Sequence, residues 1–483
     1  MHNAFSACAN APRAAPSQSA PPDHGDGLPL PQRYHAIMVV ALGITLSVLD
    51  GAIANVALPS IARHLHTSAT ASIWVVNAYQ LAVTISLLPF ASLGDRIGYR
   101  RIYLGGLAVF TAASLGCTLA GSLPALAFMR VIQGFGAAGV MSVNTALVRM
   151  IYPRAQLGRG IAINATVVAL ASAFGPTLAA GVLSVASWPW LFAINVPIGV
   201  VALVRGWRVL PANAVHPSSY DYLSAVMNAL VFGLLICAVD GLGHGEARHW
   251  VLLELAAAGG VAWFFVRRQL HQPVPLLPVD LLRIPVFALS IVTSICSFCA
   301  QTLALVALPF LLQETLGFTQ VDTGLLMTPW PLVIVGTAPL AGVLSDHYPA
   351  GLLGGIGLAL FAAGLFLLAA LAGAGAHPQA WAIGWRMALC GVGFGTFQSP
   401  NNRQMLSSAP RARSGGASGM LGTARLTGQT LGAALVALIF GVAGVTHGPT
   451  LALYIAAAFA AGAVVVSLSR LAPGVASRET GMR

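Results

Sequence analysis

The chain has 483 residues, of which 57% are hydrophobic and only 8% are charged, and its formal net charge is +11. So few charges cannot cover a soluble domain of this length, and the apolar residues exceed what its core would hold. The composition therefore excludes an ordinary soluble protein and indicates a polytopic membrane protein. All 24 basic residues are arginines, and most are scattered on short segments beside apolar runs. This scatter favours contact with anionic lipid head groups over binding of nucleic acid.

Apolar windows of about 20 residues, the length needed to cross roughly 30 Å of hydrocarbon, recur fourteen times along the chain. Each run is continuous, whereas a lipid-facing β-strand would alternate apolar and polar residues over about ten positions. We therefore expect an all-α polytopic membrane protein with fourteen transmembrane helices. The predicted spans are residues 36–58, 72–92, 101–121, 124–148, 160–183, 189–208, 221–242, 250–268, 286–312, 323–345, 350–373, 379–400, 416–442 and 448–470.

The arginines predict the orientation of these spans. Most of them lie in the tails or in loops that follow even-numbered spans, so the positive-inside rule places both termini in the cytoplasm. Residues 1–34 are rich in Ala, Pro, Ser and His and carry no cleavable signal pattern, which predicts a disordered cytoplasmic tail. We expect a multi-pass protein of the cytoplasmic (inner) membrane.

The chain also repeats itself at long range. Val56–Pro59 recurs as Val306–Pro309, and the loop Leu93–Arg96 has a weaker echo in Leu344–His347, both at an offset of about 250 residues. Arg130 has a counterpart of similar offset in Arg386. Such repeats are typical of secondary transporters, whose two halves move about a central site. The predicted domains are residues 1–34 (tail), 35–208 (N-terminal six-helix bundle), 209–285 (two linker helices with flanking loops), 286–470 (C-terminal six-helix bundle) and 471–483 (cytoplasmic tail).

Asp50 is the residue that points most directly to function. It lies inside the first predicted span, where an ionisable group costs roughly 2.5–3.5 kcal/mol on insertion scales and usually serves a transport pathway or proton relay. Arg130, inside the fourth span, also needs a partner, and Gln133 shares its helix face. We predict that these three residues form a proton-coupling site. The alternatives are an interfacial Asp50 near a helix end and an Arg130 that extends to the membrane surface.

Several segments resemble the major facilitator superfamily. Gly94–Arg101 resembles its signature loop between spans two and three, and Arg130–Gly134 is similar to its Arg-x-x-Gln-Gly element. Gly175-Pro176 followed by Gly181 resembles the motif of its proton-coupled exporters. Leu49–Pro59 and Trp190–Pro197 resemble its fourteen-span drug:proton antiporter branch. The resemblance implies two six-helix bundles with two inserted linker helices and transport by alternating access.

The same resemblance implies roles for two motifs. The loop residues Gly94, Asp95, Arg96, Gly98, Arg100 and Arg101 would latch the bundles together in the outward-facing state, whereas a plain basic turn that sets topology is the alternative. Gly175, Pro176 and Gly181 would bend the fifth span at the bundle interface. A kink of purely structural importance is the alternative there.

Polar and aromatic residues inside the spans are the candidates for lining a substrate cavity. Trp74 could instead anchor the chain at the membrane interface. No carboxylate is evident in the membrane interior of the second bundle, so a cation recognised by Asp50, an anion drawn by Arg386 or Arg425, and a neutral amphiphile all stay open. The candidates are Asn55, Trp74, Asn77, Tyr79, Gln80, Gln301, Arg386, Gln398, Asn401, Asn402 and Arg425.

The sequence offers little for metal or covalent chemistry. Cys296 and Cys299 form a Cys-x-x-Cys pair within an apolar helix, with no second pair, and no nucleotide-binding loop is present. We expect no metal and no cofactor, and transport driven by a proton gradient. The leading hypothesis is a monomeric, non-enzymatic exporter that exchanges small amphiphilic molecules for protons and contacts membrane lipids. A nutrient or metabolite uniporter or symporter is the main alternative, and a membrane enzyme or sensor is the remote one.

Overall fold

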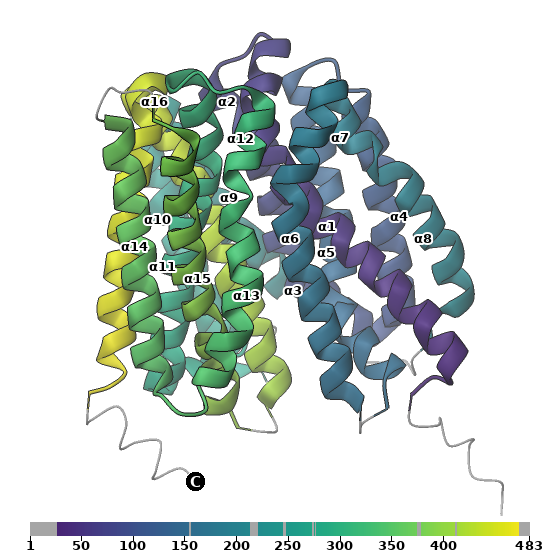
Figure 1. The fold of residues 1–483 in the computed structure, drawn as a ribbon. Coiled ribbons are helices and arrows are strands. Elements are labelled where there is room, and N and C mark those ends of the chain that lie inside the picture. The colour runs from purple at the N-terminus through teal and green to yellow at the C-terminus, as the bar shows by residue number, and fades with distance from the viewer. Residues whose placement is uncertain are drawn as a thin grey trace, which may run out of the picture.

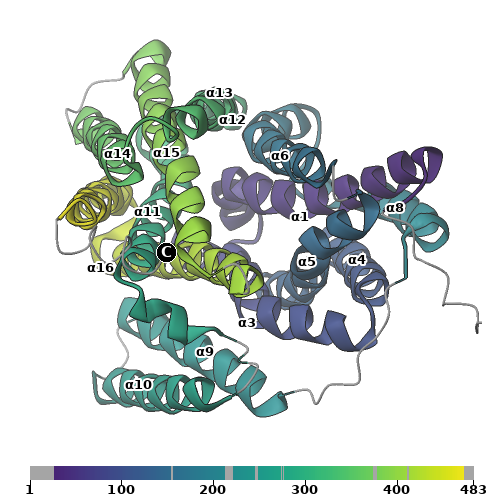
Figure 2. The same cartoon turned by 90° about the horizontal axis from the view of Figure 1, so that it is seen from below.

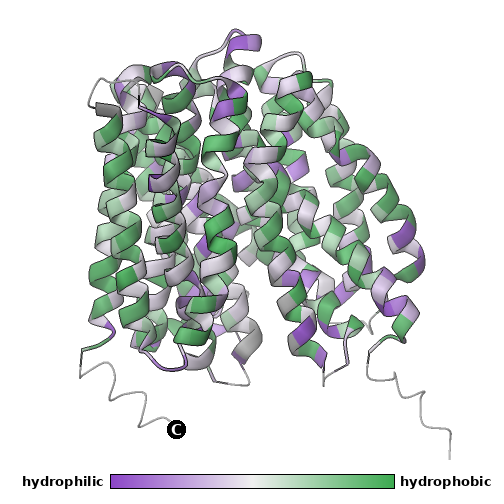
Figure 3. Cartoon of the chain, in the orientation of Figure 1, coloured by the Kyte–Doolittle hydropathy of each residue, from purple (hydrophilic) through white to green (hydrophobic). Residues whose placement is uncertain are grey.

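The computed structural model describes residues 27–153, 156–212, 221–244, 248–272, 275, 277–373, 378–410 and 413–472. All regular structure in these ranges is helical, which confirms the predicted all-α membrane fold. Figure 1 shows the long helices side by side, and Figure 3 shows hydrophobic residues along most of their length. Large apolar side chains such as Leu252, Trp263 and Val465 are exposed, as lipid-facing helices require.

The helices form an N-terminal group, a C-terminal group and a linker pair at the edge of the molecule, beside α3 and α16 (Figure 2). The linker pair is α9 (Tyr222–His244) and α10 (Arg248–His271), and η2 (Val279–Arg283) leads from it to the C-terminal group. The N-terminal group is α1 (Leu30–His64), α2 (Ala69–Ser72), α3 (Trp74–Ile97), α4 (Tyr99–Thr118), α5 (Leu123–Ile151), α6 (Leu157–Val185), α7 (Pro189–Ala193) and α8 (Asn195–Val209). The C-terminal group is α11 (Pro285–Phe310), η3 (Leu311–Thr315), α12 (Gln320–Met327), α13 (Pro329–Leu344), α14 (Ala350–Gly373), α15 (Ala380–Ser408) and α16 (Ser414–Ser469).

Twelve helical segments among the described residues are long and apolar enough to cross a membrane, against fourteen predicted spans. α16 accounts for one difference because it joins two predicted spans across Gly444, whose φ is 70° and breaks the helical geometry. α15 covers the predicted span 379–400 but is not among the twelve. Polar residues such as Arg386, Gln398 and Arg403 interrupt its apolar surface.

One predicted boundary is wrong at the N-terminus. Residues 30–34 were expected in the disordered tail, but α1 begins at Leu30. Pro31 stands in the first turn, where its fixed φ suits a helix start, and Arg33 donates to the Leu28 carbonyl. The rest of the N-terminal tail, residues 1–26, and residues 473–483 lie outside the described ranges.

Packing within each group is closer than packing between them. In the N-terminal group α5 packs against α3 and α4, and α1 packs against α6 and α8. In the C-terminal group α16 packs against α11 and α14, while α15 packs against α13 and α14. The groups meet where α6 contacts α12 and α13, and where α3 contacts α16. The linker helix α9 packs on α10, α16 and α3, beside this interface.

Glycine contacts show that the two groups repeat one packing arrangement. A Cβ on Gly106 of α4 would lie 2.7 Å from the Gly136 carbonyl oxygen of α5. About 250 residues later, a Cβ on Gly357 of α14 would lie 2.7 Å from the carbonyl oxygen of Gly393 on α15. Small residues let helix backbones approach this closely. The shared contact supports the duplication inferred from the sequence.

We predict that Gly106→Ala destabilises the protein and that Gly105→Ala does not. The added methyl group at position 106 would collide with the backbone of α5, whereas position 105 faces open space within 4 Å. Overpacking of this kind typically costs about 1–3 kcal/mol. The melting temperatures of the detergent-purified variants, with size-exclusion chromatography used to monitor thermal unfolding, measure the difference in stability. Equal melting temperatures for the two variants would contradict this account of the α4–α5 contact.

Candidate functional site

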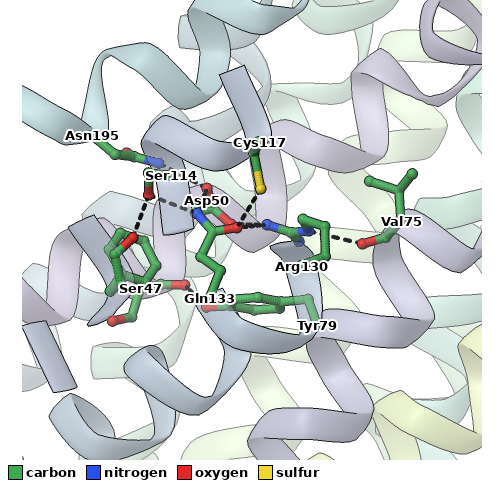
Figure 4. Close-up of polar contacts among 10 residues, drawn as sticks. Ser47, Asp50, Val75, Tyr79, Ser114, Cys117, Arg130, Gln133 and Asn195 are labelled. Atoms are coloured by element: carbon green, nitrogen blue, oxygen red, sulfur yellow. Dashed lines mark hydrogen bonds and ion pairs between the residues drawn. The ribbon is translucent and has the colours of Figure 1, made fainter. Parts of the chain in front are cut away.

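Asp50 lies at the centre of a buried polar cluster in the N-terminal group (Figure 4). Its side chain is 1% exposed and forms an ion pair with Arg130. Its Oδ1 also accepts hydrogen bonds from Gln133 Nε2 at 2.9 Å and from Asn195 Nδ2 at 2.8 Å. The carboxylate is therefore held by donors from α5 and α8 while it stands on α1. Asp50 lies in the middle part of α1 and not near either end of that helix, which speaks against the interfacial alternative.

Arg130 is fully buried inside the N-terminal group, which speaks against the alternative that it extends to the membrane surface. Its Nε donates to the Val75 carbonyl oxygen at 2.8 Å, and its Nη1 donates to Gln133 Oε1 at 2.7 Å. The guanidinium carbon lies 4.2 Å from the ring centre of Tyr79 and 5.5 Å from that of Phe192. A desolvated guanidinium is stabilised by such aromatic faces as well as by its carboxylate.

Gln133 orients the pair through a second set of contacts. Its Nε2 donates to Ser114 Oγ at 2.9 Å as well as to Asp50, and its Oε1 accepts from Arg130 and, at 3.6 Å, from the Cys117 thiol. The structure thus brings together the three residues that the sequence analysis grouped. Asn195, in the segment Trp190–Pro197, joins these three residues and was not predicted as a site residue. A lone amide within an apolar span was the available signal for it.

A cavity of about 210 Å³ lies between the two groups, next to this cluster. Arg130 lines it, whereas Asp50 is not among its lining residues, so the guanidinium connects the cavity with the carboxylate. The α1 residues Ser47, Gly51 and Asn55 form part of one wall. From the other half, Gln301, Met327, Trp330, Arg425 and Gln429 contribute.

Five of the predicted cavity residues line this cavity: Asn55, Tyr79, Gln80, Gln301 and Arg425. The other six do not: Trp74, Asn77, Arg386, Gln398, Asn401 and Asn402.

Two of those six have specific contacts elsewhere. Asn401 is buried away from the cavity, where its Oδ1 accepts from Arg470 at 2.9 Å and its Nδ2 donates to Ser294 at 2.8 Å. Arg386 donates to the Ala382 carbonyl oxygen and lies 4.4 Å from the ring centre of Trp385. Met387, the next residue, is fully buried as Arg130 is, and one helical position turns a side chain by about 100°. Met387 and not Arg386 therefore corresponds to Arg130, so the pairing predicted from the sequence is shifted by one residue.

The described part of the second half carries no copy of the polar cluster. The glycine contacts align Gly134 and Gly136 of α5 with Gly391 and Gly393 of α15. The same alignment matches Arg130 with Met387 and Gln133 with Cys390, and the repeated Val-Ala-Leu-Pro segments match Asp50 with Ala300. Met387, Cys390 and Ala300 are all fully buried. Apolar packing thus replaces the ion pair in the C-terminal group.

The residues of the predicted latch contact only their own half where contacts are described. Tyr99 donates to Asp95 at 2.5 Å, and Arg100 donates to the Trp207 carbonyl oxygen of α8. Gly98 has φ 106°, a conformation that favours glycine, so it forms the tight turn between α3 and α4. The echo of this loop in the second half contains Asp346, which pairs with Arg403 of α15. The echo loop itself gave no signal for Arg403, which lies 57 residues further along the chain.

The predicted bend residues lie at different places along α6. A Cβ on Gly175 would lie 2.5 Å from Ala52 Cβ, so α6 and α1 pack closely there. Pro176 lines the cavity, and its carbonyl oxygen lies 2.6 Å from the position of a Cβ on Gly324 in α12. Gly181 has no atom within 4 Å of its Cβ position. Gly175 thus packs within the N-terminal group, Pro176 lies at the contact between the two groups, and Gly181 lines an apolar groove.

The two halves contact each other directly at the end of α1. Arg63 forms an ion pair with Glu314 at 3.5 Å and donates to Gln313 Oε1 at 3.4 Å. Gln313 in turn donates to the Val56 carbonyl oxygen at 3.3 Å. Closer to the cavity, Gln80 donates to Gln429 at 2.8 Å.

Among the described residues no group of three His, Cys, Asp or Glu side chains could hold a metal ion.

Residues 40–433 match the family model of the Major Facilitator Superfamily. The chain is 58% identical over 453 residues to the uncharacterized transporter YebQ of Escherichia coli K12, covering 93% of this chain and 98% of that protein. It is 28% identical to the riboflavin transporter RibZ of Clostridioides difficile, covering 85% and 88%. It is 30% identical to the tetracenomycin C resistance and export protein of Streptomyces glaucescens, covering 84% and 76%. A bacterial homologue of the lysosomal transporter Spinster has the same fold, with a TM-score of 0.66, 14% identity and coverage of 92% and 97%.

We predict that removing one partner of the buried ion pair costs more stability than removing both. Arg130→Gln leaves the Asp50 carboxylate buried without its counter-charge, which typically costs about 3–5 kcal/mol. The double variant Asp50→Asn, Arg130→Gln has no uncompensated charge and should recover part of that loss. Melting temperatures of the purified single and double variants form the double-mutant cycle that measures the coupling.

The exposed pair Asp346–Arg403 provides the matched control, because its side chains are 53% and 55% exposed. Arg403→Gln should change stability by about 0–1 kcal/mol. If the effects of Asp50→Asn and Arg130→Gln simply add, the two side chains are not coupled and this description of the cluster is wrong.

Proposed function

The chain belongs to the Major Facilitator Superfamily and is a membrane transporter, and from this premise we propose that it exports small amphiphilic molecules in exchange for protons. The observation that carries the proposal is the buried Asp50 carboxylate, whose partner Arg130 also lines the cavity between the halves. A carboxylate inside the membrane is costly and is usually retained for a proton or ion pathway. Its isolation in one half makes it a single, asymmetric proton site.

The shared arginine gives a physical route for coupling. When Asp50 is ionised, it neutralises Arg130 and accepts hydrogen bonds from Gln133 and Asn195. A proton on Asp50 removes that negative charge and leaves Arg130 with a net positive charge at the cavity wall. Substrate in the cavity and proton on the carboxylate therefore influence each other through one side chain. Such a coupling free energy acts equally in both directions.

The contacts between the halves support transport by alternating access. The halves are in contact at the Arg63–Glu314 end, and by the positive-inside rule this end faces outward. At the opposite end, the latch residues contact their own half. This combination supports a cytoplasm-facing state, from which the halves would rock about the cavity. In this proposal, both termini lie in the cytoplasm.

Uptake of a metabolite by the same fold is the second candidate function. The similarity to a protein named as a riboflavin transporter favours a metabolite as the transported molecule, whereas the similarity to a protein named for resistance and export favours the first candidate. The direction of transport separates the two, because inside-out membrane vesicles accumulate exported compounds and do not accumulate imported ones.

We predict that Asp50→Asn abolishes proton-driven export. A panel of amphiphilic dyes and antimicrobial compounds would be screened with inside-out vesicles from a host that lacks its own major exporters. For any compound that the parent protein accumulates, nigericin should collapse the accumulation by dissipating the pH gradient. Asp50→Asn should reduce it at least about tenfold at equal expression, since the amide cannot bind and release the proton.

Asp346→Asn is the control variant because it removes an exposed carboxylate from the repeated loop. It should retain accumulation close to that of the parent. Accumulation by Asp50→Asn that still collapses with nigericin would refute Asp50 as the proton site. Accumulation that is insensitive to nigericin in the parent would refute proton coupling itself.

A further inference from the structure

The charges that line the cavity are one-sided. Among its lining residues are two arginines, Arg130 and Arg425, and no aspartate or glutamate. Arg130 has its counter-charge in Asp50. Arg425 has no ion pair or hydrogen bond with another described residue, and its Nε is buried without a partner. With Asp50 ionised, Arg425 is therefore the charge in the cavity wall that nothing in the described structure neutralises.

An arginine in this position needs an explanation. A guanidinium stays protonated in proteins and is expensive to keep inside a membrane without a partner. Arg130 shows what this chain supplies where a guanidinium is structural: a carboxylate, a carbonyl oxygen, an amide and two aromatic faces. Arg425 has none of these contacts. Its surroundings are those of a group whose partner comes from outside the chain.

Three residues that line the same cavity carry buried N–H groups without partners: Arg130 (Nη2), Trp330 (Nε1) and Arg425 (Nε). Asn55 Oδ1 is the one unpartnered buried acceptor among the cavity-lining residues. The three N–H groups can be satisfied only by acceptors, so a ligand that reaches them must bring acceptors. A carboxylate does so and pairs with a guanidinium in bidentate geometry.

The rest of the wall is suited to an apolar body. Leu305, Met327, Pro331 and Ile334 line the cavity from the second half, beside the indole of Trp330. Binding pockets commonly combine such apolar walls with a few polar groups that orient the ligand. The apolar side chains lie in the same half as Arg425, so one half could hold both parts of an amphiphile.

We propose that the transported molecule is an amphiphilic acid whose anionic group, a carboxylate or a similar planar acid, binds Arg425 while its apolar body packs against Met327 and Trp330. This inference rests on the proposed function only in taking the cavity as the substrate site. The two halves then have different roles, because the first half binds the proton at Asp50 and the second half binds the anion at Arg425. Cationic amphiphiles, which the sequence alone left open, are then poor ligands.

Three probes of one shape but different charge test the proposal. 2-Naphthoate is an anion, 2-naphthamide is neutral and 2-naphthylmethylammonium is a cation, and equilibrium dialysis measures their binding to the full-length purified protein in detergent. The parent should bind 2-naphthoate at least about tenfold more tightly than the other two, as charge-assisted hydrogen bonds imply. Arg425→Gln should remove this preference, and Arg425→Lys should retain part of it.

Arg386→Gln is the matched control because Arg386 also lies in the second half and has an unpartnered Nε, yet does not line the cavity. It should leave the preference for 2-naphthoate unchanged. If Arg425→Gln is not monodisperse on size-exclusion chromatography, Arg425→Lys is compared with the parent instead, and a reduced preference for 2-naphthoate in Arg425→Lys supports the proposal. A parent that does not prefer 2-naphthoate, or an Arg425 variant set that keeps the full preference, overturns the proposal.

The dialysis needs no pH gradient, so its outcome is independent of proton coupling. Loss of proton-driven export with an intact, Arg425-dependent preference would refute the proposed exchange and leave the substrate class standing. Intact proton-driven export of compounds that bind equally well to the parent and to Arg425→Gln would refute the proposed substrate class and leave the proton exchange standing.

Discussion

The ion pair between Asp50 and Arg130 is the interaction on which the N-terminal half depends. The hydrocarbon core contains no water to solvate either charge, so each must be satisfied by protein groups. The chain meets this requirement from five helices: α1 supplies the carboxylate, α5 the guanidinium and Gln133, α3 the Val75 carbonyl oxygen, α4 the hydroxyl of Ser114, and α8 the amide of Asn195. A rigid-body movement of this half can therefore carry the cluster intact, while a proton on Asp50 alters the charge balance within it.

The sequence was sufficient to predict the class of fold and the core of the site. Long continuous apolar runs specify membrane helices, and Asp50 and Arg130 stood out because charges within such runs are rare. Asn195 could not be ranked in the same way, since an amide is less costly in a helix and its partner lies 145 residues away. Only the three-dimensional packing of α1 against α8 shows that the two meet.

Register was harder to predict than the existence of helices. Arg386 and Met387 are neighbours in sequence, yet Met387 occupies the buried position equivalent to Arg130 and Arg386 lies against Trp385. Asn401 was predicted for the cavity because it is polar and lies in an apolar span, but its partner is Arg470 at the end of α16. Polarity in a span indicates that a side chain needs a partner. It does not indicate which face of the helix the partner is on.

The contact between Arg63 and Gln313 has a consequence for the history of the molecule. The repeated Val-Ala-Leu-Pro segments place these two residues at equivalent positions, 250 residues apart, and they touch across the interface. In a two-fold symmetric pair, a residue meets its own copy only where the symmetry axis passes. The approximate axis between the halves therefore runs close to this contact, at the closed end of the protein. Two separate six-helix chains that associated as identical partners would have met there, each presenting the same side chain to the other.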